Sequence, residues 1–237
     1  MQPIISALVE VALWLAVFRA VGSDTLGGYG RESYLAYALW ASFVSRISSN
    51  WMYEFRMIDD IETGAINSLV TRPVTFFESY LSQFLGYKAV VILLSFWVPT
   101  LALTVLDLPL LWDRLPLAMA TIFVYIFFAH LISFSVATLA FRLTRVSSFT
   151  VAKNLAFWVL SGELLPLDLL PEPFRSVLLS LPFCNAVYIP VGFITGRVSY
   201  ELWFQALMSL FVGIAVMSII ATFAWKRGME KYVGTGA

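Results

Sequence analysis

Long apolar runs alternate with short polar segments along the chain. Three of these runs contain no Asp, Glu, Lys or Arg, and they cover Ala89–Leu106, Leu115–Phe141 and Leu202–Trp225. A helix needs about 20 apolar residues to cross the hydrocarbon core of a bilayer. Each of the three runs therefore predicts a membrane-spanning helix.

Three further runs are of similar length but contain one or two charged residues. Glu10 and Arg19 lie in the first, Arg46 in the second, and Lys153 and Glu163 near the two ends of the third. With these runs included, the pattern predicts an all-α integral membrane protein with a single transmembrane domain over residues 1–237. Its six spans are expected at about 3–21, 34–51, 84–106, 115–138, 149–167 and 202–225.

The stretch Ser176–Gly196 is also uncharged, but Pro182 and Pro190 interrupt it. Six spans with both termini inside place ten basic residues on the cytoplasmic side and five outside, whereas a seventh span would move three of the ten outside. The positive-inside rule therefore favours six spans. The inside group is Arg46, Arg56, Arg72, Lys88, Arg142, Arg145, Lys153, Lys226, Arg227 and Lys231, and the outside group is Arg19, Arg31, Arg114, Arg175 and Arg197.

The longest inside connection, residues 52–83, is too polar to span. Ile58, Ile61, Ile66, Leu69 and Val70 recur at roughly helical spacing, and Asp59, Asp60, Glu62 and Asn67 occupy other faces. This pattern predicts a short amphipathic helix at the cytoplasmic surface, ended by Pro73. The helix could rest on lipid headgroups or dock a protein. Its acidic face favours a protein, because helices that bind membrane surfaces usually carry Lys and Arg on the polar face.

The long outside connection, Ser161–Gly196, contains several prolines. Pro171 and Pro173 can open a short helix that Pro182 closes, because proline suits the first turn of a helix but not its interior. A helix of about ten residues cannot cross a membrane. We therefore expect a broken-helix hairpin or lid at the outer face, entering the outer leaflet only where protein covers its backbone.

Composition supports a membrane protein and excludes several other classes. Of the 237 residues, 60% are hydrophobic and only 13% charged, about half the charged fraction of an average soluble domain. A soluble globular enzyme is therefore excluded. The 15 basic and 15 acidic residues leave no net charge, which argues against nucleic-acid binding. With Cys184 as the only cysteine, the chain builds no internal disulfide and no zinc cluster.

Motifs of common enzymes are missing from the sequence. It contains no phosphate-binding loop, no His-Glu-x-x-His and no Gly-x-Ser-x-Gly. The single histidine, His130, lies in the middle of a span, where it either hydrogen-bonds within the bundle or relays protons. Glu10 lies in the first span about two turns from its end, so its carboxylate either has a function or snorkels to the surface.

Two polar stripes are more informative. Ser42, Ser45, Arg46 and Ser49 share one face of the second predicted span, and Thr150, Asn154, Trp158 and Ser161 share one face of the fifth. Polar stripes in membrane helices either hold helices together or line a wet path. Arg46 favours a path along the second span, with helix packing as the alternative.

Three segments resemble ABC-2-type permeases, in the order in which that family has them. Ile61–Pro73 (IETGAINSLVTRP) resembles the stretch after their second span. Ser161–Pro171 (SGELLPLDLLP), with Leu181-Pro-Phe183 and Tyr188-Ile-Pro190, is similar to the segment after their fifth span. Trp225–Gly236 resembles their cytoplasmic tail. The start differs, because the chain opens almost directly in the first span without a basic amphipathic elbow helix.

The resemblance implies the transmembrane subunit of an ATP-driven exporter that moves a hydrophobic or amphipathic substrate across a cell membrane, the bacterial inner membrane. This subunit would pair with a second permease, identical or paralogous, and with cytoplasmic ATPase subunits. ATP and Mg²⁺ would be bound by the ATPase, and no cofactor by this chain. An ion-coupled secondary transporter, an integral-membrane enzyme and a non-transporting assembly factor remain alternatives, and the substrate is not readable from the sequence.

The resemblance also assigns roles to residues. Coupling to the ATPase would involve Asp59, Asp60, Glu62, Gly64, Asn67, Arg72 and Pro73. The substrate route would be lined by Ser42, Ser45, Arg46, Ser49, Asn154, Trp158 and Ser161. The outer gate would include Glu163, Pro166, Pro171, Pro182 and Pro190.

Overall fold

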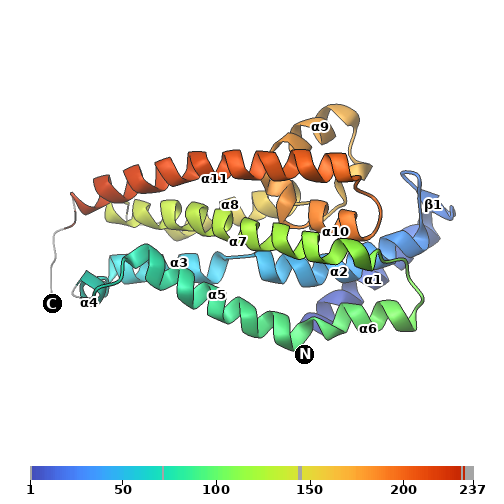
Figure 1. Cartoon of the computed structure of the whole chain (residues 1–237), viewed down its shortest axis with the longest axis horizontal. Coiled ribbons are helices and arrows are strands. Elements are labelled where there is room, and N and C mark those ends of the chain that lie inside the picture. The colour runs from blue at the N-terminus through green and yellow to red at the C-terminus, as the bar shows by residue number, and fades with distance from the viewer. Residues whose placement is uncertain (1, 71, 144–145, 231, 233–237) are drawn as a thin grey trace.

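The computed structural model describes residues 2–70, 72–143, 146–230 and 232. It is an elongated bundle whose long helices run along one axis (Figure 1). Two of the predicted cytoplasmic charges, Arg145 and Lys231, and the tail from residue 233 lie outside the described residues. The helices are α1 (Gln2–Val21), α2 (Arg31–Ser48), α3 (Trp51–Glu62), α4 (Asn67–Val70), α5 (Phe76–Ser95), α6 (Trp97–Val105), α7 (Leu115–Ala137), α8 (Val146–Leu160), α9 (Glu172–Ser180), α10 (Tyr188–Ile194) and α11 (Tyr200–Met229).

Shorter elements connect these helices. Two two-residue strands, β1 (Thr25–Leu26) and β2 (Tyr29–Gly30), pair antiparallel between α1 and α2. The 3₁₀ turns are η1 (Trp112–Arg114), η2 (Thr138–Phe141), η3 (Leu167–Leu169) and η4 (Pro182–Ala186). Figure 1 shows β1, α9 and α10 toward one end of the bundle and α4 at the other. We call these the α9 end and the α4 end.

All six predicted spans are helical, and three of them meet the length and hydropathy of a membrane span. Within the described residues these three cover Phe76–Ala102, Trp112–Phe141 and Tyr200–Met229. The chain is thus an all-α membrane protein. Several boundaries differ from the prediction, and the largest difference is at the third span, where α5 begins at Phe76 rather than at residue 84. The second helix ends at Ser48 rather than at residue 51, and the fifth ends at Leu160 rather than at residue 167.

The connection from Ser161 to Gly196 folds against the bundle at the α9 end. The helix expected between Pro171 and Pro182 is present as α9. All seven residues of α10 are buried, because this helix packs against α2, α7 and α11. A Cβ added at Gly192 would lie 2.6 Å from a methyl group of Val198, so α10 and the following turn pack too closely for a side chain there.

Arg197 anchors this connection to α2. Its guanidinium lies 2.8 Å from Asp168 on η3 and donates to the Ser33 hydroxyl at 3.1 Å. It also sits 4.0 Å from the ring centre of Tyr34 and 4.4 Å from that of Tyr29. The Arg197 and Asp168 side chains are 0% and 2% exposed. A buried charge is tolerated when it is paired and hydrogen-bonded, and Arg197 meets both conditions.

At the α4 end, an aromatic cluster fastens α11 to α5 and α7. The Trp225 ring stacks on Phe76 with ring centres 5.2 Å apart and contacts Phe134 at the same distance. Gly228 permits a close approach of α11 to η2, because a Cβ at this position would lie 2.3 Å from the Phe141 ring. The Tyr232 hydroxyl donates to the Asn67 side chain at 2.9 Å, which ties this residue to α4.

The amphipathic helix expected up to Pro73 is divided in two. Gly64 has φ +77°, a left-handed conformation that glycine adopts readily, and the turn it makes separates α3 from α4. The apolar stripe of α3 is covered by the bundle, and the position of this helix at the cytoplasmic surface stays a prediction. This helix packs against α7, η2 and α8, burying Met57, Ile58 and Ile61. Its apolar stripe therefore faces the bundle.

Replacing Arg197 with glutamine tests the anchor at the α9 end. The change leaves Asp168 buried without its charge partner, so we expect a loss of about 3–5 kcal/mol in the free energy of unfolding. Denaturant titration of the purified chain measures it. Arg175→Gln is the control, because it breaks an ion pair with Glu172, whose side chain is 75% exposed, and should cost about 1 kcal/mol or less. Equal losses would contradict the assignment of Arg197 as the anchor.

Candidate functional site

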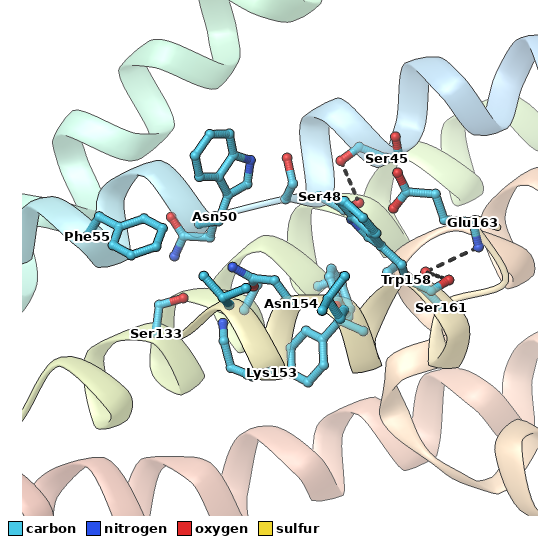
Figure 2. Close-up of a pocket in the computed structure, with 18 residues that line it drawn as sticks. Ser45, Ser48, Asn50, Phe55, Ser133, Lys153, Asn154, Trp158, Ser161 and Glu163 are labelled. Atoms are coloured by element: carbon cyan, nitrogen blue, oxygen red, sulfur yellow. Dashed lines mark hydrogen bonds between the residues drawn. The ribbon is translucent and has the colours of Figure 1, made fainter. Parts of the chain in front are cut away.

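A pocket of about 290 Å³ opens between the α2–α3 connection and α8. Figure 2 shows its walls, with α7 behind them. Its polar lining consists of Ser45, Ser48, Ser49, Asn50, Tyr125, Ser133, Lys153, Asn154, Ser161 and Glu163. Its apolar lining consists of Trp51, Phe55, Ala129, Val151, Leu155, Phe157, Trp158 and Ala186. The pocket thus has both hydrogen-bonding and apolar surface.

The serine-rich end of α2 explains why the helix is interrupted between α2 and α3, where one wall of the pocket lies. Ser48 Oγ donates to the carbonyl of Val44 at 3.0 Å, and Ser49 Oγ to that of Arg46 at 3.3 Å. Hydroxyls that bond the preceding turn compete with helix hydrogen bonds. The chain leaves the helix at Ser49, whose ψ is 139°, and starts a new helix after Asn50. This interruption makes the recess that the pocket occupies.

Most residues of the two predicted polar stripes meet in this pocket. Ser45 and Ser49 face it from the second predicted span, and Asn154, Trp158 and Ser161 from the fifth. Thr150 is fully buried and does not line it. The stripe on α2 is divided. Ser42 instead lines a small hollow with Ser95 and Pro99, and Arg46 is not among the lining residues.

A buried ion pair joins the two walls. Lys153 Nζ on α8 lies 2.6 Å from Glu54 Oε2 on α3. The Glu54 side chain is 0% exposed and that of Lys153 is 11% exposed. The ammonium group also lies 5.0 Å from the ring centre of Phe157. Because charges buried without partners are costly, this pair fixes how α8 lies against α3.

A second group of charges lies at the other end of the pocket. Glu163, which the family resemblance assigns to the outer gate, lines this end of the pocket. Its carboxylate accepts a hydrogen bond from Ser45, and its backbone N–H donates to Ser161 Oγ at 3.2 Å (Figure 2). Glu10 on α1 and Arg46 on α2 interact electrostatically with it. Glu10 thus belongs to a charge cluster that includes its countercharge.

Some buried polar atoms beside the pocket have no hydrogen-bond partner among the described residues. Both amide atoms of Asn50 are in this state, as are Glu54 Oε1 and Thr150 Oγ1. Such atoms are rare in folded proteins, and each asks for an explanation. Asn50 precedes α3 but makes no side-chain cap bond, so its amide keeps hydrogen-bonding capacity that the described residues do not use.

The expected coupling residues lie at and near the α4 end. Asp59 and Glu62 are exposed, as the prediction of water-facing carboxylates requires. Asp60 is half-buried and accepts a hydrogen bond from Tyr80. Asn67 accepts from Tyr232. Arg72 and Pro73 line a hollow of about 310 Å³ with Ile66, Val74, Thr75, Phe76 and Trp225.

The prolines predicted in the outer gate have structural positions at the α9 end. Pro166 precedes η3 and Pro171 precedes α9. Pro182 begins η4 and packs on α11, where a Cβ at Gly213 would lie 2.9 Å from its ring. Pro190 is buried within α10. These residues shape the connection and do not line the pocket.

His130 makes contacts typical of a packed histidine. Its Nε2 lies 3.2 Å from the carbonyl oxygen of Phe77, and its ring centre is 4.6 Å from that of Phe77. The geometry supports hydrogen bonding within the bundle. Among the described residues, no three His, Cys, Asp or Glu side chains cluster to hold a metal ion.

Sequence reasoning missed several residues of the site, among them Asn50, Glu54 and Ser133. Asn50 was included at the end of the second predicted span, although the run Ser48-Ser49-Asn50 is a signal for a helix break. Glu54 was assigned to a polar connection, and its partner Lys153 lies 99 positions later. Ser133, which is 1% exposed, is one serine within an apolar helix. Nothing in a single sequence pairs these positions.

The arrangement is a recess lined by hydroxyl, amide and aromatic groups. No curated protein and no solved structure matches the chain. The family model described as ABC-2 family transporter protein matches residues 4–236, nearly the whole length. The chain therefore belongs to the ABC-2 transporter family, as an ABC-2-type permease.

Proposed function

We propose that this permease is the transmembrane subunit of an ATP-driven exporter in a cell membrane, with the α4 end in the cytoplasm. The pocket between α3 and α8 is its part of the substrate route. One observation carries the proposal: the polar faces of the second and fifth predicted spans meet in this pocket. Its α3 wall also leads directly to the segment Thr63–Pro73, which the ATPase would contact.

The Glu54–Lys153 pair supports a mechanical link between the pocket and the segment that the ATPase would contact. α3 is a single helix of 12 residues, with the ion pair near its start and the exposed Asp59 and Glu62 near its end. A shift of Thr63–Pro73 driven by an ATPase would move α3 as a rigid element. Because Lys153 is bound to α3, α8 would move with it, and the pocket would change shape.

The free face of α8 supports pairing with a second permease. Phe149, Val151, Leu155, Trp158 and Val159 are each about half exposed. These apolar side chains flank the pocket, so a second subunit placed there would close the route on its open side. The second permease would be a copy of this chain or a paralogue. In states of the transport cycle in which the second permease does not cover this face of α8, lipid would cover it.

ATP and Mg²⁺ belong to the partner in this proposal. The purified chain should not hydrolyse ATP, because its sequence has no phosphate-binding loop. Reconstituted in liposomes with its cognate ATPase subunit, it should raise ATP turnover above that of the ATPase alone. Turnover by the chain without a partner would contradict the proposal. Transport driven by an ion gradient without ATP would support the secondary-transporter alternative.

The coupling role of the acidic residues is tested by Asp59→Lys combined with Glu62→Lys. If these carboxylates meet basic groups of the ATPase, the reversal replaces attraction with repulsion, which costs several kcal/mol across an interface. Binding of micromolar strength amounts to about 8 kcal/mol, so the ATPase should be lost in a pull-down. Asp60 is left unchanged, because its bond with Tyr80 supports the fold.

The matched control for this test is Glu32→Lys combined with Glu201→Lys. Both glutamates are exposed at the start of α2 and of α11, toward the α9 end, and the control changes the net charge equally. It should recover the ATPase normally. Equal recovery with both double variants would mean that Asp59 and Glu62 do not take part in docking.

A further inference from the structure

We infer that the pocket binds a neutral amphipathic molecule whose headgroup both donates and accepts hydrogen bonds, such as an amide or a polyol. The inference rests on the proposed function, because it names the substrate class of that route. It depends on three features: the unpartnered amide of Asn50, the pairing of the charged groups around the pocket, and the apolar surface that continues onto α8.

Asn50 supplies the recognition group. The residue is 7% exposed, and neither amide atom has a partner among the described residues. Figure 2 shows its amide at the same end of the pocket as Ser133, Lys153 and Asn154. Leaving buried amide atoms unbonded is costly, and a ligand with adjacent donor and acceptor groups would bond both of them. A purely apolar ligand would bond neither.

The charges disfavour an ionic headgroup. Lys153 is held by Glu54 at 2.6 Å, and Glu54 Oε1 is buried beside it without a partner. An anion drawn to Lys153 would therefore meet the negative Glu54 carboxylate, and a cation drawn to Glu54 would meet the ammonium group of Lys153. At the opposite end, Glu163 and Glu10 lie near Arg46, so an anion there would meet the two carboxylates and a cation would meet the guanidinium. A neutral headgroup avoids these repulsions.

The apolar lining provides for a hydrocarbon tail. Phe157, Trp158 and Leu155 lie along α8 on the same side as Asn154. Val151, Leu155 and Val159 are each about half exposed on the face of α8 that continues away from the recess. The volume of about 290 Å³ is at the lower end of ligand pockets. The headgroup would occupy the recess, and the tail would run along α8 into lipid.

Three brominated probes with the same chain test the inference: 11-bromoundecanamide, 11-bromoundecanoate and (11-bromoundecyl)trimethylammonium. Bromine quenches tryptophan fluorescence, and Trp158 lines the pocket. Each probe is titrated into the full chain in phosphatidylcholine nanodiscs, and the signal of Trp158→Phe is subtracted. We expect saturable quenching by the amide at a concentration at least tenfold below that for either charged probe.

Two variants of Asn50 complete the test. Asn50→Leu keeps the size but removes the hydrogen bonds and should weaken amide binding at least tenfold. Gln83→Leu, the same chemical change at an exposed position outside the pocket, should leave it unchanged. Asn50→Asp keeps the shape and adds a negative charge, so the trimethylammonium probe should then bind better than the amide. This reversal remains measurable if Asn50→Leu fails to fold.

Equal quenching by the three probes, tighter binding of either charged probe, or unchanged amide binding by Asn50→Leu would each overturn the inference. Quenching that does not saturate would overturn it as well, because it reports contact with bulk lipid only. The assay contains no ATPase and no ATP. Its failure would therefore leave the proposed coupling standing, and a failure of coupling would leave the binding preference measurable.

Discussion

The ion pair between Glu54 and Lys153 determines where the pocket lies and which elements form it. Two opposite charges separated by 2.6 Å attract strongly where water is excluded, and removing either one would leave the other buried and unpaired. The other packing of α8 is sparse, since much of its surface is exposed. The pair therefore sets the position of this helix against α3, and with it the walls of the pocket.

The remainder of the bundle is fastened independently at both ends. At the α9 end, Arg197 binds Asp168 and lies among tyrosine rings of the β1–β2 hairpin and α2. At the α4 end, Trp225 packs α11 against Phe76 and Phe134. Between these fixed ends lies a recess bounded by one loosely packed helix. Such a division allows α8 to shift while the outer connection and the inner aromatic cluster keep their contacts.

Local patterns in the sequence were sufficient for much of the fold. Uncharged runs such as Leu115–Phe141 identify helices, since length and hydropathy are properties of the segment itself. Pro171 and Pro182 predict where α9 begins and ends, because the effect of proline on the backbone is also local. The polar stripes indicated the pocket, because Ser45, Ser49, Asn154, Trp158 and Ser161 share faces that periodicity reveals.

Features that depend on distant partners could not be predicted. The sequence predicts an amphipathic helix at the cytoplasmic surface, but it does not say that α7 and α8 cover the apolar face of α3, which includes Met57 and Ile61. Glu163 was assigned to the outer gate from the family resemblance, and the sequence does not reveal that the turn at Gly162, with φ +77°, brings it to the pocket. The pairing of Glu54 with Lys153 could not be predicted either, because the two residues are 99 positions apart in the sequence.

The central claim is that the link between α3 and α8 transmits the action of the ATPase to the substrate route. Exchanging the two charges tests it most directly. Glu54→Lys and Lys153→Glu are each measured alone and together, by the ATP turnover that the permease stimulates in its partner. The account predicts that each single change abolishes the stimulation and that the double exchange restores much of it. Full stimulation with either single change, in a chain that still folds and binds the ATPase, would contradict the account.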